Sequence, residues 1–184
     1  GGTGQNPARQ ASMDSGIPKE TPSYVVNQVC GSGLRSIVAG YQSILLNDAK
    51  IVIAGGQESM TNSKEEMMLK DGLIDAYSGE SMGNTGETVS EEFDISRQVS
   101  DEFSVRSHFL ANKAWDEGWL DNEVFRVGEL SRDEGIRPDT NMEALSVLKA
   151  VFKEEGLVTA GNASQVSDGA SAVLIASEDA AKEN

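Results

Sequence analysis

Cys30 carries the strongest nucleophile of this chain, and the residues beside it leave room for a substrate. It lies in the run Val29-Cys30-Gly31-Ser32-Gly33, and it is the only cysteine among the 184 residues. A thiolate attacks electrophilic carbon, and glycines leave space for a substrate carbonyl to approach the backbone closely. The run is therefore a candidate site for nucleophilic chemistry at a carbonyl group.

The elements on either side would position Cys30. Residues 23–29 are rich in β-branched side chains and predict a strand, while apolar residues recur at helical spacing over residues 31–46. Cys30 would then lie at the carboxyl end of a strand, where open α/β sheets bind ligands. The helix N-terminus favours a thiolate, and its N–H groups, including that of Cys30 itself, could donate to an oxyanion. A buried structural cysteine is the alternative.

More elements are predicted on both sides of this pair. Asn6 followed by Pro7 is typical of a helix start, so a short helix should run to Ser15. Within residues 50–54, residues 51–54 are apolar without alternation, which predicts a strand buried on both faces. Strand, helix and strand in this order make a βαβ unit, which predicts a parallel sheet.

The middle of the chain differs in composition. Residues 61–148 are polar, charged and mostly helical in pattern, and they are typical of an insertion laid over the sheet. Ser96 can cap a helix that extends to Trp115, and another helix should cover residues 142–151. Residues 171–176 then predict a strand, followed by a new helix.

Composition argues against several classes of function. The formal net charge is −15, so nucleic acid would be repelled, and an anionic substrate would need backbone N–H groups or a few local cations. One cysteine and one histidine exclude an internal disulfide and a His/Cys metal cluster. No apolar run is long enough to cross a membrane. We therefore expect a cytoplasmic protein that uses no metal and no cofactor and has no membrane or nucleic-acid partner.

Both ends of the chain look interrupted. The first residues, Gly1 to Pro7, are typical of a loop that enters a helix, with no strand before it. Residues 178–184 are typical of the opening turns of a helix. The expectation is a fragment of a longer protein.

Several blocks of the sequence match a known family in the same order. They are Gly4-Gln5-Asn6-Pro7-Ala8-Arg9-Gln10-Ala11, Val26-Asn27-Gln28-Val29-Cys30-Gly31-Ser32-Gly33-Leu34-Arg35-Ser36, Ala54-Gly55-Gly56-Gln57-Glu58-Ser59-Met60, Ile95-Ser96-Arg97 with Asp101-Glu102-Phe103-Ser104, Thr159-Ala160-Gly161-Asn162-Ala163-Ser164, and Ser167-Asp168-Gly169-Ala170. These blocks resemble the thiolases, the family of acetyl-CoA acetyltransferases and 3-ketoacyl-CoA thiolases. The second block resembles the active-site segment of that family.

The resemblance implies a fold and its division into domains. The fold class would be α/β, a thiolase-like layered α/β core with a mainly helical loop-domain insertion, incomplete at both ends. Residues 1–60 would be part of the N-terminal core, residues 61–158 the loop domain, and residues 159–184 the return to the core.

The resemblance also implies an acyl-CoA C-acyltransferase reaction in two steps. Cys30 would attack an acyl-CoA thioester to give an acyl-enzyme and free CoA, and a deprotonated acetyl-CoA would then take the acyl group. Ser164 aligns with a residue that contacts the pantetheine arm of CoA, and Phe152 and Met82 align with apolar groups of the same tunnel. Ordinary packing of Phe152 and Met82, and a turn cap at Ser164, are the alternatives.

The sequence departs from the family pattern in ways that bear on function. The histidine that activates the nucleophile and a second catalytic cysteine lie, in the family, beyond Asn184. His108, the only histidine here, is interpreted as a surface or interface residue rather than the catalytic base. Ser81 stands where the family commonly has a histidine. The stretch over residues 60–70 is shorter than in most relatives, which favours a homodimer over a tetramer or else alters access of CoA.

Acetyl-CoA acetyltransferase is the leading hypothesis, with CoA thioesters as substrates. A longer-chain 3-ketoacyl-CoA thiolase of fatty-acid degradation is the alternative within the family. A non-catalytic, thiolase-like binding or scaffold subunit is an alternative of another class, and a redox-sensing thiol is a third. The chain by itself is expected to lack the condensation step.

Overall fold

The computed structural model describes residues 3–183, which fall into two compact units. One unit runs as far as Gly72 and resumes at Val166, and the other is Leu73–Gln165. The second unit does not coincide with the insertion expected from the sequence, residues 61–158. Its assignment as a loop domain stays a prediction.

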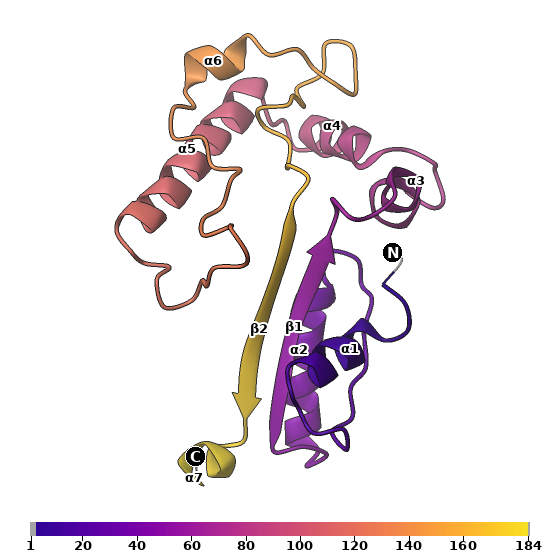
Figure 1. The fold of residues 1–184 in the computed structure, drawn as a ribbon. Helices are drawn as coiled ribbons and strands as arrows, with labels where there is room; N and C mark the ends of the chain where they lie inside the picture. The colour runs from indigo at the N-terminus through magenta and orange to yellow at the C-terminus, as the bar shows by residue number, and fades with distance from the viewer. Residues whose placement is uncertain (1–2, 184) are drawn as a thin grey trace. The chain divides into compact units, whose positions relative to one another are not determined.

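The first unit contains a two-stranded antiparallel sheet with a long helix packed against it (Figure 1). In this sheet β1 (Ile51–Ser59) pairs with β2 (Asp168–Ala176) over their full length. The long helix is α2 (Ser32–Leu45), which directly precedes β1. The other helical elements are α1 (Pro7–Asp14), α3 (Glu65–Met68), the π-helical turn η1 (Leu69–Leu73), which reaches the unit boundary, and α7 (Glu178–Glu183).

Local signals predicted α1 and α2 of this unit. Asn6 caps α1 as expected, because its side chain accepts a hydrogen bond from the Arg9 backbone N–H at 3.1 Å and Pro7 follows it. The helix expected over residues 31–46 is confirmed as α2.

The expected parallel sheet is wrong, and so is the expected strand over residues 23–29. Among the described residues this segment forms no strand and shows only an isolated bridge at Gln28. The partner of β1 is β2, which comes from the far end of the chain and runs in the opposite direction. β-branched residues favour a strand only where a neighbouring strand supplies hydrogen bonds and packing. No described strand flanks residues 23–29.

The expectation that β1 is buried on both faces is also wrong. Ala54 is buried and Val52 is half-buried, whereas Ile51 and Ile53 are 46% and 58% exposed. Alternate residues of a strand point to opposite faces, so one face is covered and the other is open to solvent.

The close approach of α2 to the sheet requires a glycine. A Cβ at Gly40 would lie 3.0 Å from side-chain carbons of both Val52 and Ile175, so the helix can approach the strands this closely only without a side chain there. Among the larger apolar residues of α2, Leu34, Tyr41 and Leu45 are exposed, while Ile37, Val38 and Ile44 are half-buried.

Gly55 of β1 is expected to tolerate no side chain. A Cβ at this position would overlap the carbonyl oxygen of Ser171 and lie 2.9 Å from the Cα of Ala172, both on β2. Gly55→Ala should therefore lower the free energy of unfolding by about 1–3 kcal/mol, as overpacking typically does. Urea unfolding followed by circular dichroism measures the change. Gly169→Ala is the matched control on β2, with no atom within 4 Å of its new Cβ; equal losses in both variants would contradict the account.

Asp168, the first residue of β2, joins the ends of the two strands. Its carboxylate accepts hydrogen bonds from the Thr61 backbone N–H at 3.0 Å, from the Thr61 hydroxyl, and from the Ser59 hydroxyl at 3.3 Å. The Thr61 hydroxyl and then the Thr61 N–H are the main causes that lower the pKa of Asp168 below its ordinary value.

Because the pKa of Asp168 is lower in the folded protein than in the unfolded chain, its ionised form stabilises the fold. That contribution is present above the unfolded pKa, about 4, and is lost as the pH falls through the folded pKa. We expect the free energy of unfolding to fall between about pH 5 and pH 3, and Asp168→Asn to flatten that dependence. Urea titrations across this range test it. An unchanged slope in the variant would show that Asp168 does not contribute.

The regular elements of the second unit are helices, and long loops join them. Its helices are α4 (Met82–Glu92), α5 (Arg97–Asp116) and α6 (Met142–Ser146). Ser96 caps α5 as expected, since its hydroxyl accepts from the Val99 backbone N–H at 3.2 Å. The helix expected over residues 142–151 ends at Ser146, because the chain then enters a loop closed by a bridge between Ala150 and Thr159.

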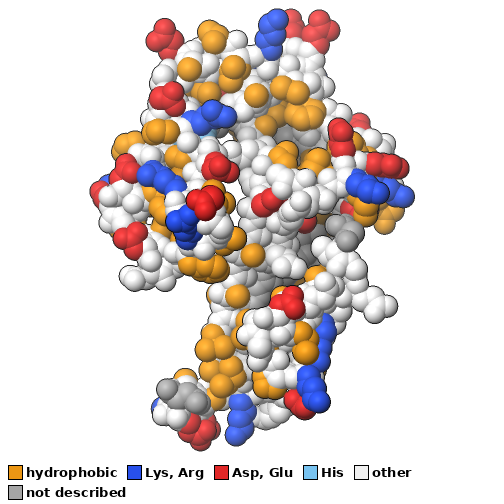
Figure 2. Space-filling view, viewed as in Figure 1, with side chains coloured by type: hydrophobic (Ala, Val, Ile, Leu, Met, Phe, Trp, Pro, Cys, Tyr) orange, Lys and Arg blue, Asp and Glu red, His pale blue; other side chains and the backbone are white. Residues whose placement is uncertain are grey.

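Few of the described side chains are buried, and several of the buried ones are polar. The buried apolar residues among those described are Ala54, Leu145 and Ala180, while large apolar side chains are exposed in both units. Figure 2 shows such side chains between charged groups on one face of the molecule. Among the residues described, no helix combines the length and apolar character needed to cross a membrane.

Candidate functional site around Cys30

Cys30 lies in a tight turn that leads into α2. The turn is closed by backbone hydrogen bonds from the Gly31 N–H to the Gln28 carbonyl at 3.0 Å and from the Ser32 N–H to the Val29 carbonyl at 3.1 Å. The Ser32 hydroxyl adds a second link, because it accepts from the Gln28 N–H at 2.8 Å and donates to the Val29 carbonyl at 2.6 Å. Cys30 therefore lies within a turn, and not at the end of the predicted strand, just before the predicted helix.

The residue before Cys30 has a strained backbone. Val29 has φ of 50°, in the left-handed region that a β-branched residue rarely adopts. Such a conformation costs on the order of 1–3 kcal/mol and persists only where neighbouring contacts enforce it. Here the Asn27 side chain accepts from the Val29 N–H at 2.9 Å, and Ser32 holds the Val29 carbonyl. Sequence reasoning missed this strain, since nothing in the residue types indicates it.

The thiol of Cys30 is exposed, which argues against the buried structural cysteine. Helix α2 has Gly31 at its N-cap, and no side chain caps it. Among the described residues, the Cys30 N–H takes no part in the hydrogen bonds of the turn. An exposed nucleophile beside uncapped helix N–H groups is the arrangement that can attack a carbonyl and then stabilise the oxyanion that forms.

The start of α2 is fixed against β1. The Ser36 hydroxyl lies 2.7 Å from the carbonyl oxygens of both Gly33 and Gly55. A Cβ at Gly56 would lie 3.2 Å from the Cα of Gly33, so two glycines allow the backbones of helix and strand to meet. The strand therefore supports the turn that carries Cys30.

Phe152 of the second unit contacts the residue that follows Met82. Met82 is the first residue of α4, where the Ser81 hydroxyl accepts from the Asn84 N–H at 3.4 Å as the N-cap. The Phe152 ring stands directly over Gly83, the next residue, so that a Cβ at Gly83 would overlap it. Met82 and Phe152 are 41% and 43% exposed, so neither is an ordinary core residue.

Ser164 is exposed and follows a turn held by a buried network. The Asn162 side chain accepts from the Thr159 N–H at 2.7 Å and donates to the Asp101 carboxylate at 3.0 Å. Asp101 is 1% exposed and pairs with Arg97 at 2.8 Å. Ser164 belongs to the same unit as Met82 and Phe152, and Cys30 belongs to the other.

A cavity in the second unit was not predicted from the sequence. It has a volume of about 350 Å³, within the range of small-molecule sites. Two arginines, Arg106 and Arg137, line it, and neither forms an ion pair with a described carboxylate. The other lining residues are Glu102, Val105, Phe109, Pro138, Thr140 and Met142. The sequence offered no signal for this cavity, because whether an arginine lacks an ion-pair partner depends on the fold.

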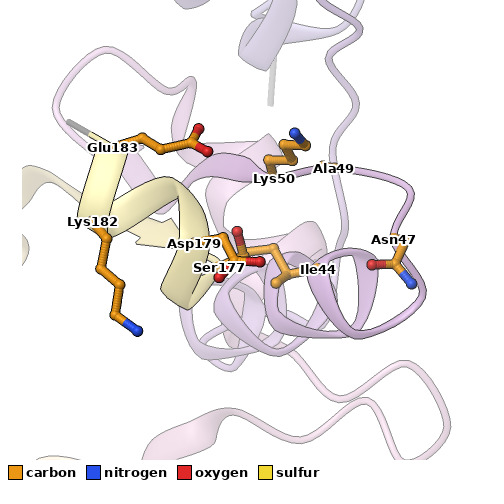
Figure 3. A pocket seen from close by; sticks show the side chains of 8 residues that line it. All are labelled: Ile44, Asn47, Ala49, Lys50, Ser177, Asp179, Lys182 and Glu183. Carbon is orange, nitrogen blue, oxygen red and sulfur yellow. The ribbon is translucent and has the colours of Figure 1, made fainter.

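A second cavity, of about 340 Å³, lies in the first unit between the end of α2 and the start of α7 (Figure 3). Its charged lining residues are of both signs, and Lys182 points away from Lys50. It lies at the opposite end of α2 from Cys30, about 20 Å away for a helix of this length. This cavity is thus separate from the turn of Cys30.

His108 lies on α5 and is half-buried. Its Nδ1 accepts a hydrogen bond from the Arg137 backbone N–H at 3.2 Å, beside the arginine-lined cavity. That contact gives the imidazole a structural partner in the second unit.

The family of the chain follows from comparison with known proteins. A sequence profile described as "Thiolase, N-terminal domain" matches residues 1–67 and 62–179. The chain belongs to the thiolase family. The two matched pieces meet at residues 62–67, within the stretch that is expected to be shortened.

Individual members of the family resemble this chain over nearly its whole length. A probable acetyl-CoA acyltransferase of Staphylococcus epidermidis is 43% identical, over 98% of this chain and 52% of the relative. The human mitochondrial 3-ketoacyl-CoA thiolase in complex with CoA has a TM-score of 0.88 at 39% identity, over 96% of this chain and 50% of that one. The Bacillus anthracis acetyl-CoA acetyltransferase has a TM-score of 0.89 at 32% identity, over 100% of this chain and 52% of that one.

The fold is therefore thiolase-like, as the sequence predicts, with helices and strands mixed. The chain spans about half the length of the curated relatives it matches. The roles of Cys30, Met82, Phe152 and Ser164 remain predictions that rest on the geometry above.

Proposed function

We propose that this thiolase chain carries the acyl-accepting cysteine of an acetyl-CoA acetyltransferase, with Cys30 as the nucleophile. The observation that supports it most is the turn of Cys30, in which an exposed thiol follows a strained residue and adjoins uncapped helix N–H groups. Strain held by specific contacts is typical of functional sites.

The proposed step is an exchange of thioesters. The Cys30 thiolate attacks the carbonyl carbon of acetyl-CoA, forming a carbon–sulfur bond and an oxyanion that the Cys30 N–H can stabilise. Collapse of this intermediate breaks the bond to the CoA sulfur. CoA leaves as a thiolate and takes a proton from water, and the acetyl group stays on Cys30.

The proposal covers this half-reaction for the chain itself. Condensation requires a base to remove a proton from the methyl carbon of a second acetyl-CoA, and the single histidine, His108, is engaged with Arg137 instead. The complete ping-pong transfer is proposed for the whole protein. The homodimer and the cytoplasmic location stay predictions.

We further propose that the second unit binds CoA. Met82, Phe152 and Ser164 would contact the pantetheine arm, and the arginine-lined cavity would hold the nucleotide end. Its guanidinium groups suit phosphates, and its apolar wall, which includes Phe109 and Pro138, suits a purine ring. The chain is acidic overall, so an anionic substrate requires local cations, and the two arginines of the cavity would supply them.

Intact-mass measurement after incubation with acetyl-CoA tests the proposal. We expect one acetyl group on the parent protein and none on Cys30→Ala. An adduct that persists in Cys30→Ala would refute the nucleophile, and no adduct on the parent would favour a non-catalytic, thiolase-like binding subunit. Repeating the reaction with longer acyl-CoA thioesters separates an acetyltransferase from a longer-chain 3-ketoacyl-CoA thiolase.

A further inference from the structure

One face of α4 holds the loop that carries Phe152. Three residues spaced four apart lie on this side of the helix, namely Gly83, Glu87 and Glu91. Gly83 lies under the Phe152 ring, and Glu91 forms an ion pair with Lys153, the next residue of the loop. The Glu91 carboxylate also raises the pKa of the Lys153 ammonium, through its hydrogen bond and its charge.

Glu87 is the central contact of this face. It is only 5% exposed, and its carboxylate accepts hydrogen bonds from two consecutive backbone groups, the Leu157 N–H at 2.9 Å and the Val158 N–H at 2.8 Å. A Cβ at Gly156 would overlap the same carboxylate, so the chain passes close to it. A buried charge is costly unless hydrogen bonds compensate it, and here the loop backbone supplies them.

The loop connects this contact to Phe152. The Val151 N–H donates to the Val158 carbonyl at 2.9 Å, and a bridge between Ala150 and Thr159 closes the loop at its base. The residue before Phe152 is thus hydrogen-bonded to the residue that Glu87 holds. Displacement of Val158 would move Val151 and with it the aromatic ring over Gly83.

We propose that Glu87 is a positioning residue, which sets the place of Phe152 for the thioester arm of an acyl-CoA. The inference rests on the proposed function, since it assigns Phe152 to that substrate. Glu87 acts through the loop backbone and does not touch the substrate. Its loss should therefore weaken binding and leave the acyl-transfer step at Cys30 unchanged.

The rate of acetylation of the full chain, measured against acetyl-CoA concentration, tests this assignment. Glu87→Gln should raise the half-saturating concentration about tenfold, the effect of losing one charge-assisted hydrogen bond, with the same limiting rate. Glu92→Gln, an exposed carboxylate at the end of the same helix, should match the parent. In a Phe152→Ala background, Glu87→Gln should cause no further change.

A second variant tests the position of Phe152 without removing the Glu87 carboxylate, whose loss could disturb the local fold. Gly83→Ala improves helix propensity and leaves the carboxylate intact, but its methyl group must displace the Phe152 ring. It should raise the half-saturating concentration as Glu87→Gln does.

The outcomes separate this inference from the proposed function. An unchanged half-saturating concentration in Glu87→Gln, or effects of Glu87→Gln and Phe152→Ala that multiply independently, would overturn the positioning role alone. A reduced limiting rate would show that Glu87 acts on chemistry instead and would also overturn it. No acetylation of the parent chain would overturn the proposed function and, with it, the substrate assigned to Phe152.

Discussion

Replacement of Arg106 and Arg137 by glutamine together is expected to weaken binding of CoA by about 100- to 10,000-fold. Each guanidinium can form charge-assisted hydrogen bonds with a phosphate, worth about 1.5–3 kcal/mol, and a factor of ten corresponds to about 1.4 kcal/mol. Both line the cavity of about 350 Å³, and neither has an ion-pair partner among the described residues. Titration calorimetry with CoA measures the change.

A matched control separates the cavity from overall charge. Arg126→Gln with Arg132→Gln removes the same charge from the same unit, but these arginines pair with Glu129 and Asp116 and do not line the cavity. This control should bind CoA almost as the parent does. Equal weakening in both double variants would mean that the net charge matters and the cavity does not.

Ser32→Ala is expected to slow the reaction of Cys30 with iodoacetamide about tenfold near neutral pH. The Ser32 hydroxyl holds both the Gln28 N–H and the Val29 carbonyl, and without it the strained Val29 can relax. Cys30 would then lose its fixed, exposed position beside the uncapped N–H groups at the start of α2. With a single cysteine in the chain, intact-mass kinetics report this residue alone.

Ser43→Ala is the control for this variant, because the Ser43 hydroxyl donates only to the Ala39 carbonyl within α2. Its alkylation rate should equal that of the parent. Indistinguishable rates for Ser32→Ala and the parent would show that the hydroxyl does not hold the nucleophile.

Local signals in the sequence predicted the elements that depend on local contacts. The Asn6-Pro7 start of α1, the Ser96 cap of α5 and the helical spacing that gave α2 all concern residues within a few positions of each other. Capping and helical hydrogen bonds form within one segment, so the sequence of that segment specifies them.

The sheet could not be predicted in the same way. β1 pairs with β2 across more than a hundred residues, and nothing in residues 51–59 identifies that partner or its direction. The β-branched residues 23–29 matched the composition of a strand without having a described neighbour to pair with. Strand composition reflects a fit to a half-buried surface, which only the tertiary structure provides.

The sequence predicted Cys30, the central residue of the candidate site, but not the residues that hold it in place. The type and flanks of Cys30 indicated a nucleophile, but the strain at Val29 and the links made by Ser32 depend on backbone geometry. Glu87 could not be recognised either, because a carboxylate is usually exposed and its burial depends on backbone groups some seventy residues away.

The central claim is that Cys30 accepts an acyl group from CoA, and the most direct test is to locate that group. The chain is incubated with acetyl-CoA that carries an isotope label in the acetyl group, digested, and mapped by mass spectrometry with and without neutral hydroxylamine, which cleaves thioesters. We predict that the label lies on the peptide containing Cys30 and that hydroxylamine removes it. Label that resists hydroxylamine, or that lies on any other peptide, would contradict the account.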